Sequence, residues 1–199
     1  MSSDRLKALT DGVVAIIITI MVLEMRPPAS DTPQALLAIL PTFLSYGLSF
    51  IFIAIYWNNH HHFFLLAPRV TGTVLWANLN LLFWMSLVPF STAWMGEHPQ
   101  SPWPAATYGI TLLSCALAWR IMQAAIISSQ GARSLLRRAV GGDWKGKASA
   151  AGYLLGIGAS FLSPTAGASM YAGAASLWLI PDRRVRRVFL VPDLDDGET

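Results

Sequence analysis

The stretch from Leu9 to Met25 reads LTDGVVAIIITIMVLEM and ends at Arg26-Pro27-Pro28, and it decides the class of the fold. A helix that crosses a membrane needs about 20 apolar residues, within a range of about 17–25. The stretch has this length and carries Asp11 near its start and Thr19 near its midpoint. We therefore expect it to form a first membrane-spanning helix.

Further apolar runs follow at 35–57, 70–94 and 105–127. The last run, 148–180, is too long for one spanning helix and slightly short for two. Ser163-Pro164-Thr165 interrupts it near its centre, and proline breaks a helix, so we expect two short helices there. The pattern predicts an all-α membrane protein with six transmembrane helices in one domain, residues 1–190, followed by a short acidic tail, residues 191–199.

The overall composition agrees with a surface that faces lipid. Only 13% of the 199 residues are charged and 54% are hydrophobic, whereas a soluble domain carries roughly 25% charged residues. The sequence pI of about 9.3 does not indicate nucleic-acid binding, because the basic residues lie in short segments between apolar runs. Such placement orients a membrane protein.

The basic residues predict the orientation. The first apolar run has no convincing small-x-small cleavage site after it, so we expect it to be retained as a helix. Six helices with the N-terminus inside place 13 of the 14 Lys and Arg residues on the cytoplasmic side. Only Arg26 lies outside. We therefore expect both termini in the cytoplasm and the protein in a bacterial inner membrane. The inward set is Arg5, Lys7, Arg69, Arg120, Arg133, Arg137, Arg138, Lys145, Lys147, Arg183, Arg184, Arg186 and Arg187.

Small residues recur four apart in the last apolar region. Gly152 and Gly156 form one such pair, and Ser169 and Gly173 form another. Small residues at this spacing let helices approach closely in lipid. The two pairs predict a tightly packed pair of helices.

Polar residues inside the spans are few and costly, so each is a potential functional residue. Arg5 and Asp11 lie six residues apart, about 240° around a helix, and are therefore poor partners for each other. Trp57, Asn58 and His60 lie at the same predicted depth at the end of the second run. We expect a polar network that ties the first helix to the second.

The triplet His60-His61-His62 raises the possibility of a metal site or a membrane-embedded enzyme. Consecutive residues on a helix point about 100° apart, so three in a row chelate one ion poorly. Hydrogen bonding at the membrane interface is the favoured interpretation. A proton-coupled transporter that uses Asp11 or Glu24 is a further alternative.

The first helix carries a narrow stripe at the spacing i, i+3, i+4 and i+7. Its members are Ile16, Thr19, Ile20 and Leu23. A threonine hydroxyl can bond to its own helix backbone, so the stripe taken alone fits a lipid-facing or packed surface. Periodicity leaves a pore-lining role open.

Three segments resemble elements of a known family in the correct order. Residues 5–11, RLKALTD, resemble the R-x-x-x-F-S-D signature of the endosomal and lysosomal potassium channel family of the transmembrane protein 175 type. This sequence departs from it conservatively at Leu9 and Thr10. Residues 12–20 with Leu23-Glu24 resemble the rest of that family's first helix, and residues 57–61, WNNHH, its W-x-x-H-H element. Leu82-Phe83 with residues 87–92, LVPFST, resembles its L-F…L-x-P-F-x-T stretch.

The resemblance implies a potassium-permeable channel that is not an enzyme and needs no cofactor. Bacterial members assemble as homotetramers of six-helix chains, and the first helix of each subunit lines the pore. Carried over by position, a hydrophobic constriction falls at Ile16, Ile20 and Leu23, with Thr19 as a possible polar layer. Selectivity for potassium over sodium is then modest, since no carbonyl filter is present. Glu24 is placed at the outer mouth, where four copies form an anionic ring, or is an ordinary interfacial acid.

The same resemblance gives a structural role to the polar residues at the cytoplasmic end of the first helix. Residues Arg5, Thr10 and Asp11 are then expected to hold this helix against Trp57 and His60 without touching the ion. The implied partners are potassium ions, membrane lipids and other copies of the chain.

Overall fold

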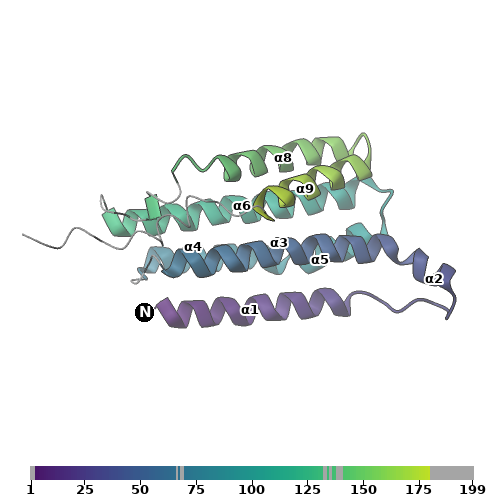
Figure 1. Ribbon diagram of the computed structural model, residues 1–199, viewed down its shortest axis with the longest axis horizontal. Helices are drawn as coiled ribbons and strands as arrows, with labels where there is room; N and C mark the ends of the chain where they lie inside the picture. Colours follow the sequence, from purple (N-terminus) through teal and green to yellow (C-terminus); the bar gives the residue numbers. More distant parts are fainter. Residues whose placement is uncertain are drawn as a thin grey trace, which may run out of the picture.

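The computed structural model describes residues 3–65, 67, 70–131, 134, 136–137 and 141–179. The regular elements in these ranges are α-helices that run side by side along the long axis of the molecule (Figure 1). The predicted acidic tail, the Arg183–Arg187 cluster and Arg69, Arg133 and Arg138 lie outside the described residues. The helices are α1 (Ser3–Leu23), α2 (Pro33–Ala38), α3 (Leu40–Leu65), α4 (Gly72–Ser86), α5 (Val88–Glu97), α6 (Pro102–Gln130), α8 (Trp144–Ser160) and α9 (Pro164–Leu179).

The bundle has two sides. Helix α1 lies along one edge and packs on α3, α4 and α5, whereas α8 and α9 pack on each other and on α6 at the opposite edge (Figure 1). Each side has its own buried cluster. One is centred on α1, α3, α4 and α6, and the other on Phe52, Tyr108, Tyr153 and Tyr171.

Four helical segments of the described chain are long and apolar enough to cross a membrane. They are Ser3–Leu23, Leu40–Leu65, Gly72–Glu97 and Pro102–Gln130, and each overlaps one of the first four predicted runs. The protein is therefore an integral membrane protein of the all-α class. Helices α8 and α9 have 17 and 16 residues, so a total of six spans remains a prediction.

The predicted end of the second helix is wrong. Helix α3 does not stop at Trp57 but continues to Leu65 and includes the histidine triplet. Asn and His lower helix propensity by only a few tenths of a kcal/mol. The chain reaches no proline until Pro68, so nothing before it removes a backbone hydrogen bond. The polar residues after Trp57 therefore do not end the helix.

The third predicted run is divided into two helices. Helix α4 ends at Ser86 and α5 begins at Val88. Pro89 lacks the N–H that would continue the hydrogen-bond ladder, and the Leu87 N–H instead donates to the Trp84 carbonyl at 3.2 Å. The helical hydrogen-bond ladder is therefore interrupted at Leu87, although a single apolar segment, Gly72–Glu97, continues across the break.

The predicted division of the last apolar region is confirmed. Helix α8 ends at Ser160 and α9 begins at Pro164, a residue well suited to the first turn of a helix. Gly156 faces the ring of Tyr171, and Gly152 lies 3.6 Å from the Ala174 side chain. The second predicted small-residue pair is wrong, because Gly173 is exposed and has no such neighbour within 4 Å.

A third helix also approaches Tyr171 closely. Gly109 of α6 lies where any added Cβ would overlap the Tyr171 hydroxyl and the Ile157 side chain. That hydroxyl donates to the carbonyl of Ala105 at 3.1 Å. A glycine is thus required for α6 to meet the α8–α9 pair.

We expect Gly109→Ala to lower the midpoint of thermal unfolding of the purified protein in detergent. The added methyl group must displace Tyr171, and overpacking of this kind costs about 1–3 kcal/mol. Gly158→Ala in α8 is the matched control, since nothing lies within 4 Å of its added Cβ. Equal midpoints for the two variants would contradict the tight packing assigned to Gly109.

Candidate functional site

Helix α1 presents one face to the bundle and leaves the rest of its surface open. The buried side chains recur every three or four residues along the helix and contact α3, α4 and α5. They are Ser3, Leu6, Thr10, Val14, Ile17 and Met21. The predicted pore-facing residues are not among them.

The predicted stripe lies on the open surface of α1. Ile16 is 58% exposed, Ile20 40% and Leu23 78%. Thr19 is exposed too, and its hydroxyl donates to the Ile16 carbonyl at 2.9 Å. The hydroxyl is therefore satisfied within the helix while the side chain stays on the outward surface.

A groove of about 640 Å³ runs between α1 and the interrupted third span. Its wall is mostly apolar and includes Ile16 and Ile20 together with Phe90 and Trp94 of α5. Charged residues also line it: Glu24, Arg26 and Glu97. The sequence analysis did not identify Glu97, the last residue of α5, since a single acid at the end of an apolar run carries no periodic signal.

A buried triangle of polar side chains joins α1 to α3 and α4. The Nε2 atom of His60 lies 2.9 Å from Oδ1 of Asn78 and 3.4 Å from Oγ1 of Thr10. The Asn78 amide nitrogen donates to the same Thr10 oxygen at 3.1 Å. An amide oxygen only accepts, so the contact with Asn78 places the proton of His60 on Nε2. All three side chains are buried.

Asn78 is the member of this triangle that the sequence analysis missed. It lies in the third predicted run and belongs to helix α4. Polar residues in membrane spans are rare enough for each to be examined individually. That criterion, applied to every span, would have found it.

A second contact between α1 and α3 lies close to the buried triangle in sequence but is exposed. The Trp57 indole nitrogen donates to Oδ1 of Asp11 at 2.8 Å. Four of the five predicted network residues are thereby in contact across α1 and α3. Arg5 is exposed and lies outside these contacts, in keeping with its angular offset from Asp11.

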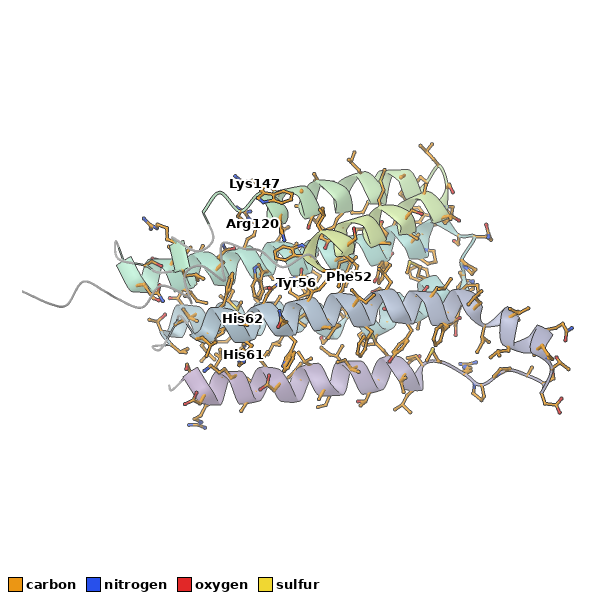
Figure 2. The ribbon with its side chains drawn as sticks, viewed as in Figure 1. Phe52, Tyr56, His61, His62, Arg120 and Lys147 are labelled. Atoms are coloured by element: carbon orange, nitrogen blue, oxygen red, sulfur yellow. The ribbon has the colours of Figure 1, made fainter. Side chains whose placement is uncertain are left out.

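The three histidines do not converge. His60 is buried and its ring packs 4.5 Å from that of Phe64, whereas the rings of His61 and His62 lie 5.6 Å apart at a steep angle. Figure 2 labels both of these on α3. Within the described residues, no group of three or more His, Cys, Asp or Glu side chains is arranged to hold a metal ion.

Comparison with known proteins gives consistent matches to one family. The family model described as endosomal/lysosomal potassium channel TMEM175 matches residues 5–89. The structure resembles the crystal structure of a lysosomal potassium-selective channel TMEM175 homolog from Chamaesiphon minutus. The TM-score is 0.75 at 27% identity, over 92% of this chain and 97% of that one.

Relatives extend from bacteria to vertebrates. An endosomal/lysosomal proton channel TMEM175 of Danio rerio is 26% identical over 132 residues, 63% of this chain and 24% of that protein. A potassium channel of Chryseobacterium sp. (strain P1-3) is 46% identical over 187 residues, 94% of this chain and 97% of that protein. The chain therefore belongs to the endosomal/lysosomal potassium channel TMEM175 family.

Proposed function

We propose that the protein is a potassium-permeable channel in which four copies of α1 surround a central pore. Membership of a potassium channel family supports the activity. The observation that carries the assignment to α1 is its position at the edge of the bundle, with Ile16, Ile20 and Leu23 on the outward surface. A single chain supplies one such helix, so the pore requires an oligomer.

The proposed constriction is a ring of isoleucine and leucine side chains. Potassium releases its hydration water more readily than sodium, so a narrow apolar ring favours potassium. The sequence has no T-V-G-Y-G segment whose carbonyl oxygens would replace the lost water. Selectivity for potassium over sodium is therefore modest, with the Thr19 layer as a second contribution.

The proposed topology has six spans with both termini in the cytoplasm of a bacterium. The 17 residues of α8 span about 26 Å at 1.5 Å per residue, close to the hydrocarbon thickness of about 30 Å. Flanking residues and local thinning accommodate a shortfall of this size. Helices α1 and α8 begin toward the same end of the bundle (Figure 1). Lys7 belongs to the N-terminal part of α1 and Lys147 to the first turn of α8, whereas Arg26 follows the C-terminal end of α1.

The polar contacts of α1 have a structural role in this proposal. Thr10 and His60, joined by Asn78, set the rotation of α1, and the Asp11–Trp57 bond fixes its end. Arg5 is retained as an anchor on the family motif alone. None of these side chains lies on the stripe that faces the ion.

Proton permeation is the second candidate function. The vertebrate relatives are named endosomal/lysosomal proton channels, and this alternative uses Asp11 of α1 and Glu24, which follows the helix, as the proton-carrying acids. A saturable, strongly pH-dependent flux would favour a proton-coupled transporter.

We expect liposomes that contain the purified protein to release potassium, when loaded with it, faster than matched liposomes release sodium. We expect Ile16→Asn to change the rate of potassium flux or the ratio of the two fluxes. An amide in the constriction hydrates the passing ion and removes the apolar barrier. Dye-based flux assays with each cation measure both quantities. Light scattering on the same sample reports whether the protein is tetrameric.

Val22→Asn is the matched control for this experiment. Val22 is 44% exposed on the same helix but lies outside the stripe. It should leave the flux ratio unchanged. Absence of flux from folded tetramers, or equal effects of the two variants, would contradict the placement of the pore.

We expect Glu24→Gln to lower the potassium current at low ionic strength. Four carboxylates at the outer mouth concentrate cations by their field, and this field is screened over about 3 Å in 1 M salt. The difference from wild type should therefore vanish as salt rises toward about 1 M. Asp31→Asn, in the exposed segment before α2, is the control. A difference that persists at high salt would exclude an electrostatic role for Glu24.

We expect Asn78→Leu to destabilise the protein by about 1–3 kcal/mol, because it leaves buried groups of Thr10 and His60 without their shared partner. Asn80→Leu is the control on the same helix, since Asn80 is only half-buried. Thermal unfolding in detergent compares the two. Equal midpoints would show that the triangle does not hold α1 in place.

A further inference from the structure

A cleft of about 280 Å³ lies between α6 and the start of α8, on the side of the bundle away from α1. Its lining is rich in basic side chains: Arg120 of α6, Arg137 of the connecting segment and Lys147 of α8. Ala124 and Ile127 supply apolar wall. Figure 2 shows Arg120 and Lys147 near the first turn of α8.

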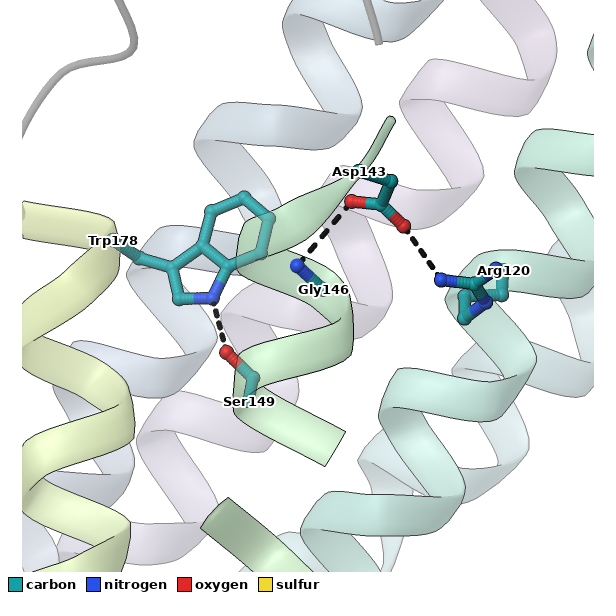
Figure 3. A network of polar contacts seen from close by, with 5 residues as sticks. All are labelled: Arg120, Asp143, Gly146, Ser149 and Trp178. Atoms are coloured by element: carbon teal, nitrogen blue, oxygen red, sulfur yellow. Dashed lines mark hydrogen bonds and ion pairs between the residues drawn. The ribbon is translucent and has the colours of Figure 1, made fainter. Parts of the chain in front are cut away.

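Asp143, the acidic residue of the cleft, has bonding partners within the chain. Asp143 accepts an ion-paired hydrogen bond from Nη1 of Arg120 at 2.8 Å, and its other carboxylate oxygen accepts from the Gly146 N–H at 3.3 Å (Figure 3). It therefore caps α8 and neutralises one of the three cations. A further bond, from the Trp178 indole to Ser149 at 2.8 Å, ties α9 to the next turn of α8.

Two positive charges remain in the cleft. Arg137 and Lys147 are exposed, and neither takes part in an ion pair within the described part of the chain. The N-terminus of α8 adds its partial positive charge at the same place. A compact anion with several oxygen acceptors suits this arrangement, and phosphate has that chemistry.

The surroundings of the cleft favour a phosphate that belongs to a lipid headgroup over a free phosphate ion. Leu117 and Ile121 lie within one turn of Arg120 on α6 and are 51% and 56% exposed. Trp144, at the start of α8, is 52% exposed, and tryptophan is enriched where a membrane meets water. Apolar surface beside a basic cleft fits acyl chains attached to the bound anion. A free phosphate ion would make no use of it.

We propose that this cleft binds the phosphate headgroup of an anionic phospholipid, with its acyl chains along Leu117 and Ile121. Arg137 and Lys147 donate to the phosphate oxygens, and Arg120 contributes charge while it remains bonded to Asp143. Basic clefts between membrane helices recognise such headgroups by charge. The proposal does not depend on ion conduction, because the cleft and α1 lie on opposite sides of the bundle.

The test is thermal unfolding of the full-length protein in detergent with three added probes: phosphatidylglycerol, phosphatidylcholine of the same chain length, and inorganic phosphate. We expect a concentration-dependent rise in the midpoint with phosphatidylglycerol only. Arg137→Gln with Lys147→Gln should weaken that response at least about tenfold, because two charge-assisted hydrogen bonds are lost. Lys7→Gln with Arg26→Gln removes the same charge elsewhere and should retain the wild-type response.

Ala124→Trp provides a second variant that fills the cleft and leaves every charge in place. We expect it to weaken the response to phosphatidylglycerol while the midpoint without lipid stays unchanged. Equal responses of wild type and the Arg137→Gln/Lys147→Gln variant would overturn the proposal. So would an equal response to phosphatidylcholine, or to inorganic phosphate at the same concentration.

Discussion

The position of α1 depends on the hydrogen bonds among Thr10, His60 and Asn78. In lipid an apolar side chain gains little by turning from acyl chains to protein, so hydrophobicity alone does not fix the rotation of a helix. A hydroxyl that must find a partner does fix it. Ile16 lies six residues after Thr10, about 240° around the helix. Holding Thr10 inward therefore turns Ile16 and its stripe outward.

The interrupted third span depends on a similar constraint deeper in the bundle. The Ser49 hydroxyl lies 2.7 Å from that of Thr92 and 2.9 Å from that of Tyr108, and it so connects α3, α5 and α6. Thr92 also donates to the Val88 carbonyl at 2.7 Å, beside the break at Pro89. Polar contacts with α3 thus hold α5 just after the break. Phe90 and Trp94 of α5 line the groove beside α1.

The sequence predicted those features that lipid imposes on composition, and missed those set by single contacts. Run length located the spans, and Pro164 located the division between α8 and α9, because both depend on backbone chemistry. The predicted end of α3 was wrong because polar residues such as Asn and His do not by themselves end a helix. Asn78 was missed because one amide in an apolar helix changes no pattern, although its two hydrogen bonds complete the triangle.

The two sides of the bundle differ in what they leave exposed, and this difference supports the different surroundings that we propose for them. The edge formed by α1 exposes a narrow stripe next to a groove with acids among its lining residues, which suits a water-filled path shared with other copies. The opposite edge exposes Leu154 and Leu155 on α8, 59% and 63%, which suits acyl chains. An assembly that brings the α1 edges together leaves α6 and α8 at its periphery. In the tetramer that we propose, the basic cleft then remains open to lipid.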